Sequence, residues 1–209
     1  MIKKYFAALS ATALIGVAPY ALAASSTDLT VTGLITPNAC TPSLSSDGIV
    51  DYGKIPAKDL KQNTSTPLEE KTLMLGVKCD GPTPFALFAK DNRAGSASQA
   101  PSVFFGVGKI NETQKLGGYL LTMINAVADG EAVQTIKSVD GKNDWRSQIF
   151  MWPGQYMSVA AIGNPGSPIP IQDLTLELGI ATSIARADGL DLTNEVLIDG
   201  SATLEMNYL

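Results

Sequence analysis

The chain has 209 residues, a formal charge of −5 and no histidine. The lack of histidine removes the usual general base and the commonest zinc ligand, which excludes Ser–His–Asp, Cys–His and histidine–metal catalysis. Fifteen basic residues against 20 acidic ones argue against binding of nucleic acid. Two cysteines are too few for a four-thiolate metal site, so we expect neither a metal nor a cofactor.

Residues 1–23 predict a secretory signal peptide. Lys3 and Lys4 precede an apolar run over residues 7–18, and small residues then mark a cleavage point after Ala23. The run is shorter than the roughly 20 residues that a membrane-spanning helix needs. No later stretch approaches that length. We therefore expect an exported protein that begins at residue 24 and has no membrane span in its mature chain.

Both cysteines, Cys40 and Cys79, lie in the exported part of the chain. An even pair of cysteines in an oxidising compartment predicts a disulfide. Closing a loop of about forty residues stabilises a fold by roughly 4 kcal/mol in the chain-entropy treatment. Each cysteine ends a candidate strand, so the bond is expected to join two strands.

The remaining sequence predicts strands and turns. Four segments alternate apolar and other residues with a period of two, namely 29–35, 73–79, 174–180 and 202–209. Shorter candidate strands are residues 49–52, 85–89, 103–107, 132–136, 149–152 and 157–162, separated by turn clusters rich in Gly, Pro, Asn and Asp. Residues 119–127 fit a helix or a strand equally well. Many short strands with frequent turns indicate an all-β, antiparallel sandwich or barrel over residues 37–209, as a single domain.

The segment 29–35 is unusual because it lies about five residues from the predicted mature N-terminus, where chains are ordered only if something binds them. Gly33 falls on the apolar face of this segment with Leu29, Val31 and Ile35. A glycine weakens an ordinary strand but permits close approach of another backbone. Two interpretations therefore remain open: a plain first strand, or an N-terminal extension over residues 24–36 that binds elsewhere.

Several short stretches resemble chaperone–usher pilins of the type 1 class. The run GLITPNAC, residues 33–40, has the pilin spacing of seven residues between a strand glycine and the first cysteine. Residues 50–55, the strand that ends at Cys79 and the terminal ATLEMNYL with its penultimate Tyr208 also resemble that class. The middle region 90–145 departs from ordinary pilins. It is similar to the fimbria-like family called domain of unknown function 1120.

This resemblance implies an immunoglobulin-like, pilin-type β-sandwich that lacks its last strand. A periplasmic chaperone would first fill the resulting groove. At an outer-membrane usher, the N-terminal extension of a neighbouring pilus subunit would then replace it by strand addition. Carried over by position, the donor-strand residues are Leu29, Val31, Gly33 and Ile35. The residues of the C-terminal strand that face the groove or the chaperone are Ala202, Leu204, Met206 and Tyr208.

The resemblance thus implies a fimbrial or fimbria-like structural subunit at the cell surface, with a role in adhesion. The alternative is a self-complemented periplasmic or secreted binding protein on the same fold, because Val196 stands where pilins carry a glycine. We do not expect an enzyme, since no catalytic motif is visible.

Two further groups of residues invite other functions. Acidic residues at 140 and 144, and at 188, 191 and 195, are better explained as solvated turns than as calcium ligands. Trp145, Trp152 and Tyr156 are candidates for a sugar-stacking patch, although aromatic residues more often belong to a core or a sheet edge.

Overall fold

The computed structural model describes residues 29–33 and 39–209. The predicted signal peptide, the predicted boundaries at residues 23/24 and 36/37, and the candidate donor residue Ile35 lie outside the described residues. Residues 29–33 have no regular secondary structure, so the strand predicted for 29–35 is not formed over its described part. Leu29 and Val31 are 88% and 85% exposed.

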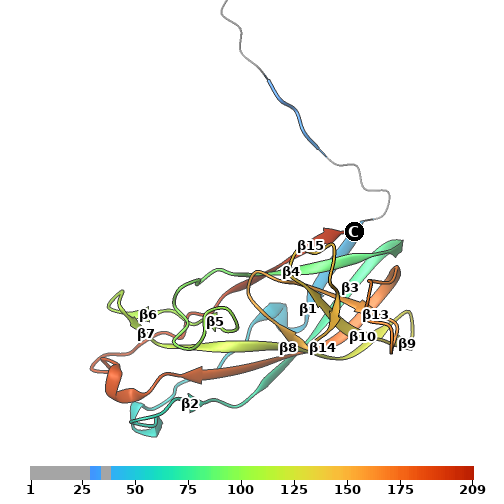
Figure 1. The fold of residues 1–209 in the computed structure, drawn as a ribbon. Coiled ribbons are helices and arrows are strands. Elements are labelled where there is room, and N and C mark those ends of the chain that lie inside the picture. Colours follow the sequence, from blue (N-terminus) through green and yellow to red (C-terminus); the bar gives the residue numbers. More distant parts are fainter. Residues whose placement is uncertain (1–28, 34–38) are drawn as a thin grey trace, which may run out of the picture. The chain divides into compact units, whose positions relative to one another are not determined.

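Residues 39–209 form one compact unit built from two antiparallel sheets. The larger sheet follows the path β1–β3–β14–β8–β12, and β2, β5 and β9 extend it at its margins (Figure 1). Its main strands are β1 (Cys40–Leu44), β3 (Lys71–Thr83), β8 (Gly117–Ala128), β12 (Phe150–Met151) and β14 (Ile171–Ile184). The marginal strands are β2 (Thr66–Pro67), β5 (Phe105–Gly106) and β9 (Glu131–Ala132).

The second sheet has five strands in the order β11–β10–β13–β4–β15. Its strands are β4 (Phe85–Asp91), β10 (Gln134–Ser138), β11 (Arg146–Ser147), β13 (Tyr156–Ala160) and β15 (Ala202–Tyr208). A short hairpin, β6 (Lys109–Ile110) and β7 (Gln114–Lys115), and the 3-10 turns η1 (Ser45–Gly48), η2 (Ala57–Asp59) and η3 (Ala187–Gly189) complete the described fold. The prediction of an all-β antiparallel sandwich is confirmed.

The main core lies between the two sheets and follows from the period-two alternation of the strands. In β14, Leu174, Leu176 and Leu178 point inward and are almost completely buried, as are Leu87 of β4 and Met157 of β13. The alternate residues of the second sheet build a smaller cluster on its other face, where Ala86, Ile136 and Ala160 pack with Trp145.

The predicted disulfide is confirmed: Cys40 of β1 is bonded to Cys79 of β3. The two residues lie directly opposite each other in the antiparallel register of these strands. The bond therefore fixes β1 at the edge of the larger sheet.

Two predicted elements are settled by the structure. Residues 119–127, which fitted a helix or a strand, belong to β8. Residues 49–52, expected as a strand, are not one. Left-handed backbone at Asp47 and Gly48 turns the chain away from β3, and Gly53 adopts a positive φ just beyond the segment, so no ladder forms between these turns. In residues 29–33 and 39–209, no helix has the length and apolar character needed to cross a bilayer.

Candidate functional site

An apolar groove runs along the margin of the sandwich, between the chain at residues 44–52 and the chain at residues 198–204. Its cavity volume is about 180 Å³. The groove lies where the edges of the two sheets face each other, because β1 ends the larger sheet and β15 ends the smaller one. We call it the edge groove.

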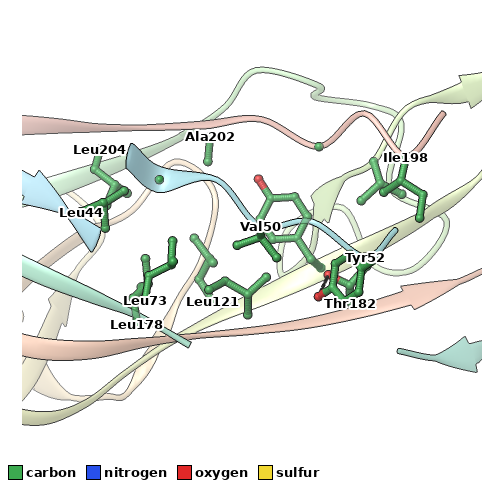
Figure 2. Close-up of a pocket in the computed structure, with 15 residues that line it drawn as sticks. Leu44, Val50, Tyr52, Leu73, Leu121, Leu178, Thr182, Ile198, Ala202 and Leu204 are labelled. Atoms are coloured by element: carbon green, nitrogen blue, oxygen red, sulfur yellow. Dashed lines mark hydrogen bonds between the residues drawn. The ribbon is translucent and has the colours of Figure 1, made fainter. Parts of the chain in front are cut away.

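The floor of the edge groove belongs to the main core. Leu73 of β3, Leu121 of β8 and Leu178 and Ile180 of β14 line it, and each is less than a tenth exposed. Figure 2 shows Leu73, Leu121 and Leu178 on one side of the pocket and Leu204 and Ala202 opposite them. A groove with this floor favours apolar side chains over polar ones.

On the sides that face the edge groove, the main-chain N–H and C=O groups of the two wall strands have no strand partner. β15 forms its ladder with β4 alone, and β1 forms its ladder with β3 alone. Across the described chain, no backbone-to-backbone hydrogen bond joins β15 to residues 40–52. An extended polypeptide is the natural partner for such edges, because it offers N–H and C=O groups at the strand spacing.

Tyrosine hydroxyls make polar links beside the groove. The Tyr208 hydroxyl accepts a hydrogen bond of 2.9 Å from the backbone N–H of Cys40, which ties the end of β15 to the start of β1. The Tyr52 hydroxyl donates to Thr182 Oγ1 at 2.9 Å, which fastens the strandless segment 49–52 to β14. The first link joins the strands of the two walls, and the second fixes one wall to a strand of the floor.

The chain that leads into β15 is held from outside by residues that follow β4. Arg93 Nε and Nη2 donate to the two carboxylate oxygens of Asp199, each at 2.8 Å. Asn92 Nδ2 donates to the hydroxyls of Ser201 and Thr203 at 3.0 and 2.9 Å. The hydrogen bonds from Arg93 hold the pKa of Asp199 below its usual value. We call this set of contacts the outer clamp. It holds the groove wall in place from outside, whether or not a ligand occupies the groove.

One end of the groove depends on a glycine next to an aromatic ring. A Cβ atom at Gly200 would lie 3.0 Å from Tyr119 Cε1, which is closer than side chains normally pack. The Tyr119 ring stacks on Phe105 with a centroid separation of 5.2 Å. Burial raises the pKa of Tyr119, so its hydroxyl stays protonated at all ordinary pH values. Any larger residue at 200 would displace this ring or the wall.

The residues predicted for the C-terminal strand have different surroundings. Ala202 and Leu204 line the edge groove, and Met206 packs against the main core. Tyr208 is not among the groove-lining residues. Its hydroxyl accepts a hydrogen bond from the Cys40 backbone, and the residue lines a second hollow described below. Of the candidate donor residues, Leu29, Val31 and Gly33 are exposed, and Gly33 has no atom near the position of a Cβ.

Sequence reasoning missed the outer clamp and most of the groove floor. The floor residues were recognisable as apolar positions of alternating strands, but the pattern does not say which of them lie under an open edge. The clamp joins Arg93 to Asp199, which are 106 residues apart, and no local pattern links them.

The other sequence candidates form neither a metal site nor an aromatic patch in the part of the chain that the structure describes. Among residues 29–33 and 39–209, no group of three or more Cys, Asp or Glu residues is placed to hold a metal ion. Trp145 is buried in the smaller cluster, with Ala86, Ile136 and Ala160. Lys137 Nζ lies 3.6 Å from the centroid of the Trp152 ring and covers that face. The two tryptophans therefore do not form a shared exposed patch with Tyr156.

The fold and the groove define a disulfide-bonded antiparallel β-sandwich protein with an apolar groove between two strand edges. Residues 29–103 match the family described as "Protein of unknown function (DUF1120)", the family that the sequence resemblance indicated. The matched region contains β1 to β4, both cysteines and one wall of the groove.

Two proteins of Escherichia coli (strain K12) are similar over most of their length. Protein GltF is 27% identical over 235 aligned positions, which cover 90% of this chain and 91% of GltF. The uncharacterized protein YhcF is 24% identical over 208 positions, which cover 82% of this chain and 85% of YhcF. The similarity therefore extends well beyond the DUF1120 region.

Proposed function

We propose that this chain is a fimbrial or fimbria-like structural subunit that is assembled by strand donation. In this proposal the edge groove receives residues 24–36 of a second copy or of a related subunit. The observation that carries the proposal is the pairing of an apolar floor with two unpaired strand edges in one groove.

The proposed donor segment suits the groove in pattern and in length. Residues 29–35 place Leu29, Val31 and Ile35 on one face, with threonines at 30 and 32 on the other. The free edge of β15 is seven residues long, which is the length of the alternating donor segment. The apolar face would cover the leucine floor while the backbone pairs with β15. Gly33 would sit where the two backbones approach most closely.

The proposal includes partners and a location. A periplasmic chaperone would occupy the edge groove before assembly, and an outer-membrane usher would exchange it for the next subunit. The protein would be exported, pass through the periplasm and end in a fimbrium at the cell surface. The Cys40–Cys79 disulfide supports an oxidising compartment. The role is structural and adhesive rather than catalytic.

A labelled peptide spanning residues 25–36 tests the proposal when it is titrated into the chain that begins at residue 24. We expect saturable binding in fluorescence polarisation. The change Val31→Asp in the peptide is expected to abolish binding, because it places a charge on the apolar face. The matched change Thr32→Asp, on the opposite face, is expected to leave binding within about threefold.

Substitutions in the chain whose edge groove receives the peptide complete this experiment. Leu204→Ala, in the groove wall, is expected to weaken peptide binding at least tenfold, whereas Glu205→Ala, its exposed neighbour, is expected to leave it unchanged. Deletion of residues 24–36 should give a folded chain that still accepts the peptide. A deleted chain that loses all protease resistance, while the intact chain is a stable monomer that ignores the peptide, would establish the self-complemented alternative.

A further inference from the structure

A second hollow lies on the other face of the five-stranded sheet, away from the main core. Its volume of about 670 Å³ falls within the range of ordinary ligand sites. The loop 140–145 and the loop 166–168 form its walls, and Tyr156 of β13 and Asn207 of β15 contribute from the sheet. Both loops are turn clusters of the sequence that the proposed function does not use. We call this hollow the outer cavity.

The loop 140–145 is rigidly held. Asp140 Oδ1 accepts hydrogen bonds from the Ser138 hydroxyl and from the backbone N–H groups of Lys142 and Asn143, at 2.8–2.9 Å. Asp140 Oδ2 accepts from Asn143 Nδ2 at 3.1 Å. These bonds lower the pKa of Asp140, so the carboxylate stays charged. The charge of Asp140 is thus used inside the loop and is not available to a ligand.

Packing holds the same loop against the sheet. Trp145 anchors one end of it in the cluster with Ala86, Ile136 and Ala160. Gly141, with φ of +70°, lies directly against the Tyr156 ring, and a Cβ atom there would fall within 3.1 Å of three ring carbons. A wall fixed in this way is pre-organised, which reduces the entropy lost when a ligand binds.

The groups left free around the outer cavity are a mixture of donors and acceptors. In the described part of the chain, the Asp144 carboxylate and the Asn143 side-chain oxygen have no hydrogen-bond partner. The Tyr156 ring lines the cavity beside Gly141. The Asn207 side chain lines the same space; its Nδ2 donates to the Glu205 carbonyl at 3.3 Å, which leaves its oxygen and its second proton free. Carboxylate and amide groups next to an aromatic ring suit a ligand that has both hydroxyl groups and apolar C–H faces.

The charged side chains that line the outer cavity narrow the class of ligand further. Asp140 and Asp144 are opposed by Lys142 alone among the charged side chains that line the cavity, so an anionic ligand meets net repulsion. We propose that the outer cavity is a saccharide-binding site for one or two neutral pyranose units. The groups in contact would be Asp144, Asn143, Asn207 and the Tyr156 ring. This site is separate from the edge groove, and its test does not depend on strand donation.

Saturation-transfer NMR on the chain that begins at residue 24 tests this site with four probes: methyl α-mannoside, methyl β-galactoside, lactose and sialyllactose. We expect at least one of the three neutral probes to bind, with a Kd on the order of 1 mM. Sialyllactose is expected to bind at least fivefold more weakly than lactose. Absence of transfer to every neutral probe, or equal binding of sialyllactose, would overturn the proposal.

Single substitutions test whether the neutral sugar probe binds in the outer cavity. Asp144→Asn should weaken binding of the best neutral probe about tenfold. Asp47→Asn is the matched control, because Asp47 is also exposed and has nearly the same φ, +52° against +53° for Asp144, but lies outside the cavity. Equal affinities of these two variants would show that the probe binds elsewhere. Leu204→Ala, in the edge groove, should leave sugar binding unchanged, so failure of strand donation and failure of this proposal give different results.

Discussion

The strands β14 and β15 have similar sequences and very different surroundings. Both alternate apolar and polar residues, as LTLELGI in β14 and ATLEMNY in β15. β14 pairs on both sides, with β3 and β8, and its inward leucines are at most 3% exposed. β15 pairs on one side only, and its Leu204 and Met206 are half-buried.

The comparison shows that the burial pattern of a strand depends on its neighbours as well as on its own alternation. β14 is enclosed by residues that the chain itself supplies. β15 has the same alternating side chains but faces the edge groove, where no strand of the described chain covers it. An alternating strand with one unfilled side is a structural argument for a partner.

The largest expected effect follows from a charge in the centre of β14. Leu176→Asp places an unpaired carboxylate at a position that is 0% exposed, and the cost should exceed the whole stability of a domain this size, typically 5–15 kcal/mol. We expect no soluble folded protein in a periplasmic extract. Thr175→Asp, one residue away on the exposed face, should yield normal amounts. Similar yields of the two variants would mean that the register of β14 is wrong.

Removal of the disulfide should have the next largest effect. The double change Cys40→Ala and Cys79→Ala leaves no free thiol and should lower the free energy of unfolding by about 4 kcal/mol. The reason is that the bond closes a loop with a sequence separation of 39 residues. Urea denaturation of the oxidised protein and of the variant measures the difference. A loss below about 1 kcal/mol would show that β1 holds its edge position without the bond.

The sandwich and its disulfide were predictable from the sequence because both depend on local signals. Alternation identified β3, β14 and β15, and the pair of cysteines in an exported chain predicted the bond between Cys40 and Cys79. The strand predicted at 49–52 was wrong because the flanking turns at Asp47, Gly48 and Gly53 carry this apolar segment off the sheet.

The edge groove was predictable only in part. The C-terminal strand and its apolar side were expected from alternation and from the pilin resemblance. The other wall, the floor and the outer clamp depend on contacts between residues more than 30 positions apart, for which a single sequence holds no signal. The outer cavity likewise arises because two distant turn clusters fold over one sheet face.

A charge in β15 sharpens the comparison with β14. Met206 packs against the core, whereas Asn207 points to the outer cavity. Met206→Asp should lower the free energy of unfolding by roughly 2–3 kcal/mol, through lost burial and the cost of desolvating a carboxylate. Asn207→Asp should change it by less than about 0.5 kcal/mol, in the manner of surface substitutions. Equal effects in thermal unfolding would contradict the register of β15.

The smallest effect concerns the outer clamp and depends on pH. Arg93→Ala removes the two-pronged contact with Asp199, so the wall that leads into β15 loses one of its supports. Both side chains are partly exposed, so the loss of stability should be small but measurable in the midpoint of thermal unfolding. Lys54→Ala is the control, because the ion pair of Lys54 with Glu195 is almost fully exposed and should contribute less.

The sign of the pH dependence follows from the pKa of Asp199. Arg93 lowers this pKa in the folded protein below its usual value of 3.8, so the folded state binds the proton less readily than the unfolded state. The stabilisation is therefore fully present above the unfolded pKa and is lost as the pH falls through the folded pKa. The difference between wild type and Arg93→Ala should stay constant from about pH 7 to pH 5 and shrink below about pH 4. A difference that instead persists to pH 2 would show that Arg93 supports the groove wall through packing of its alkyl chain rather than through its charge.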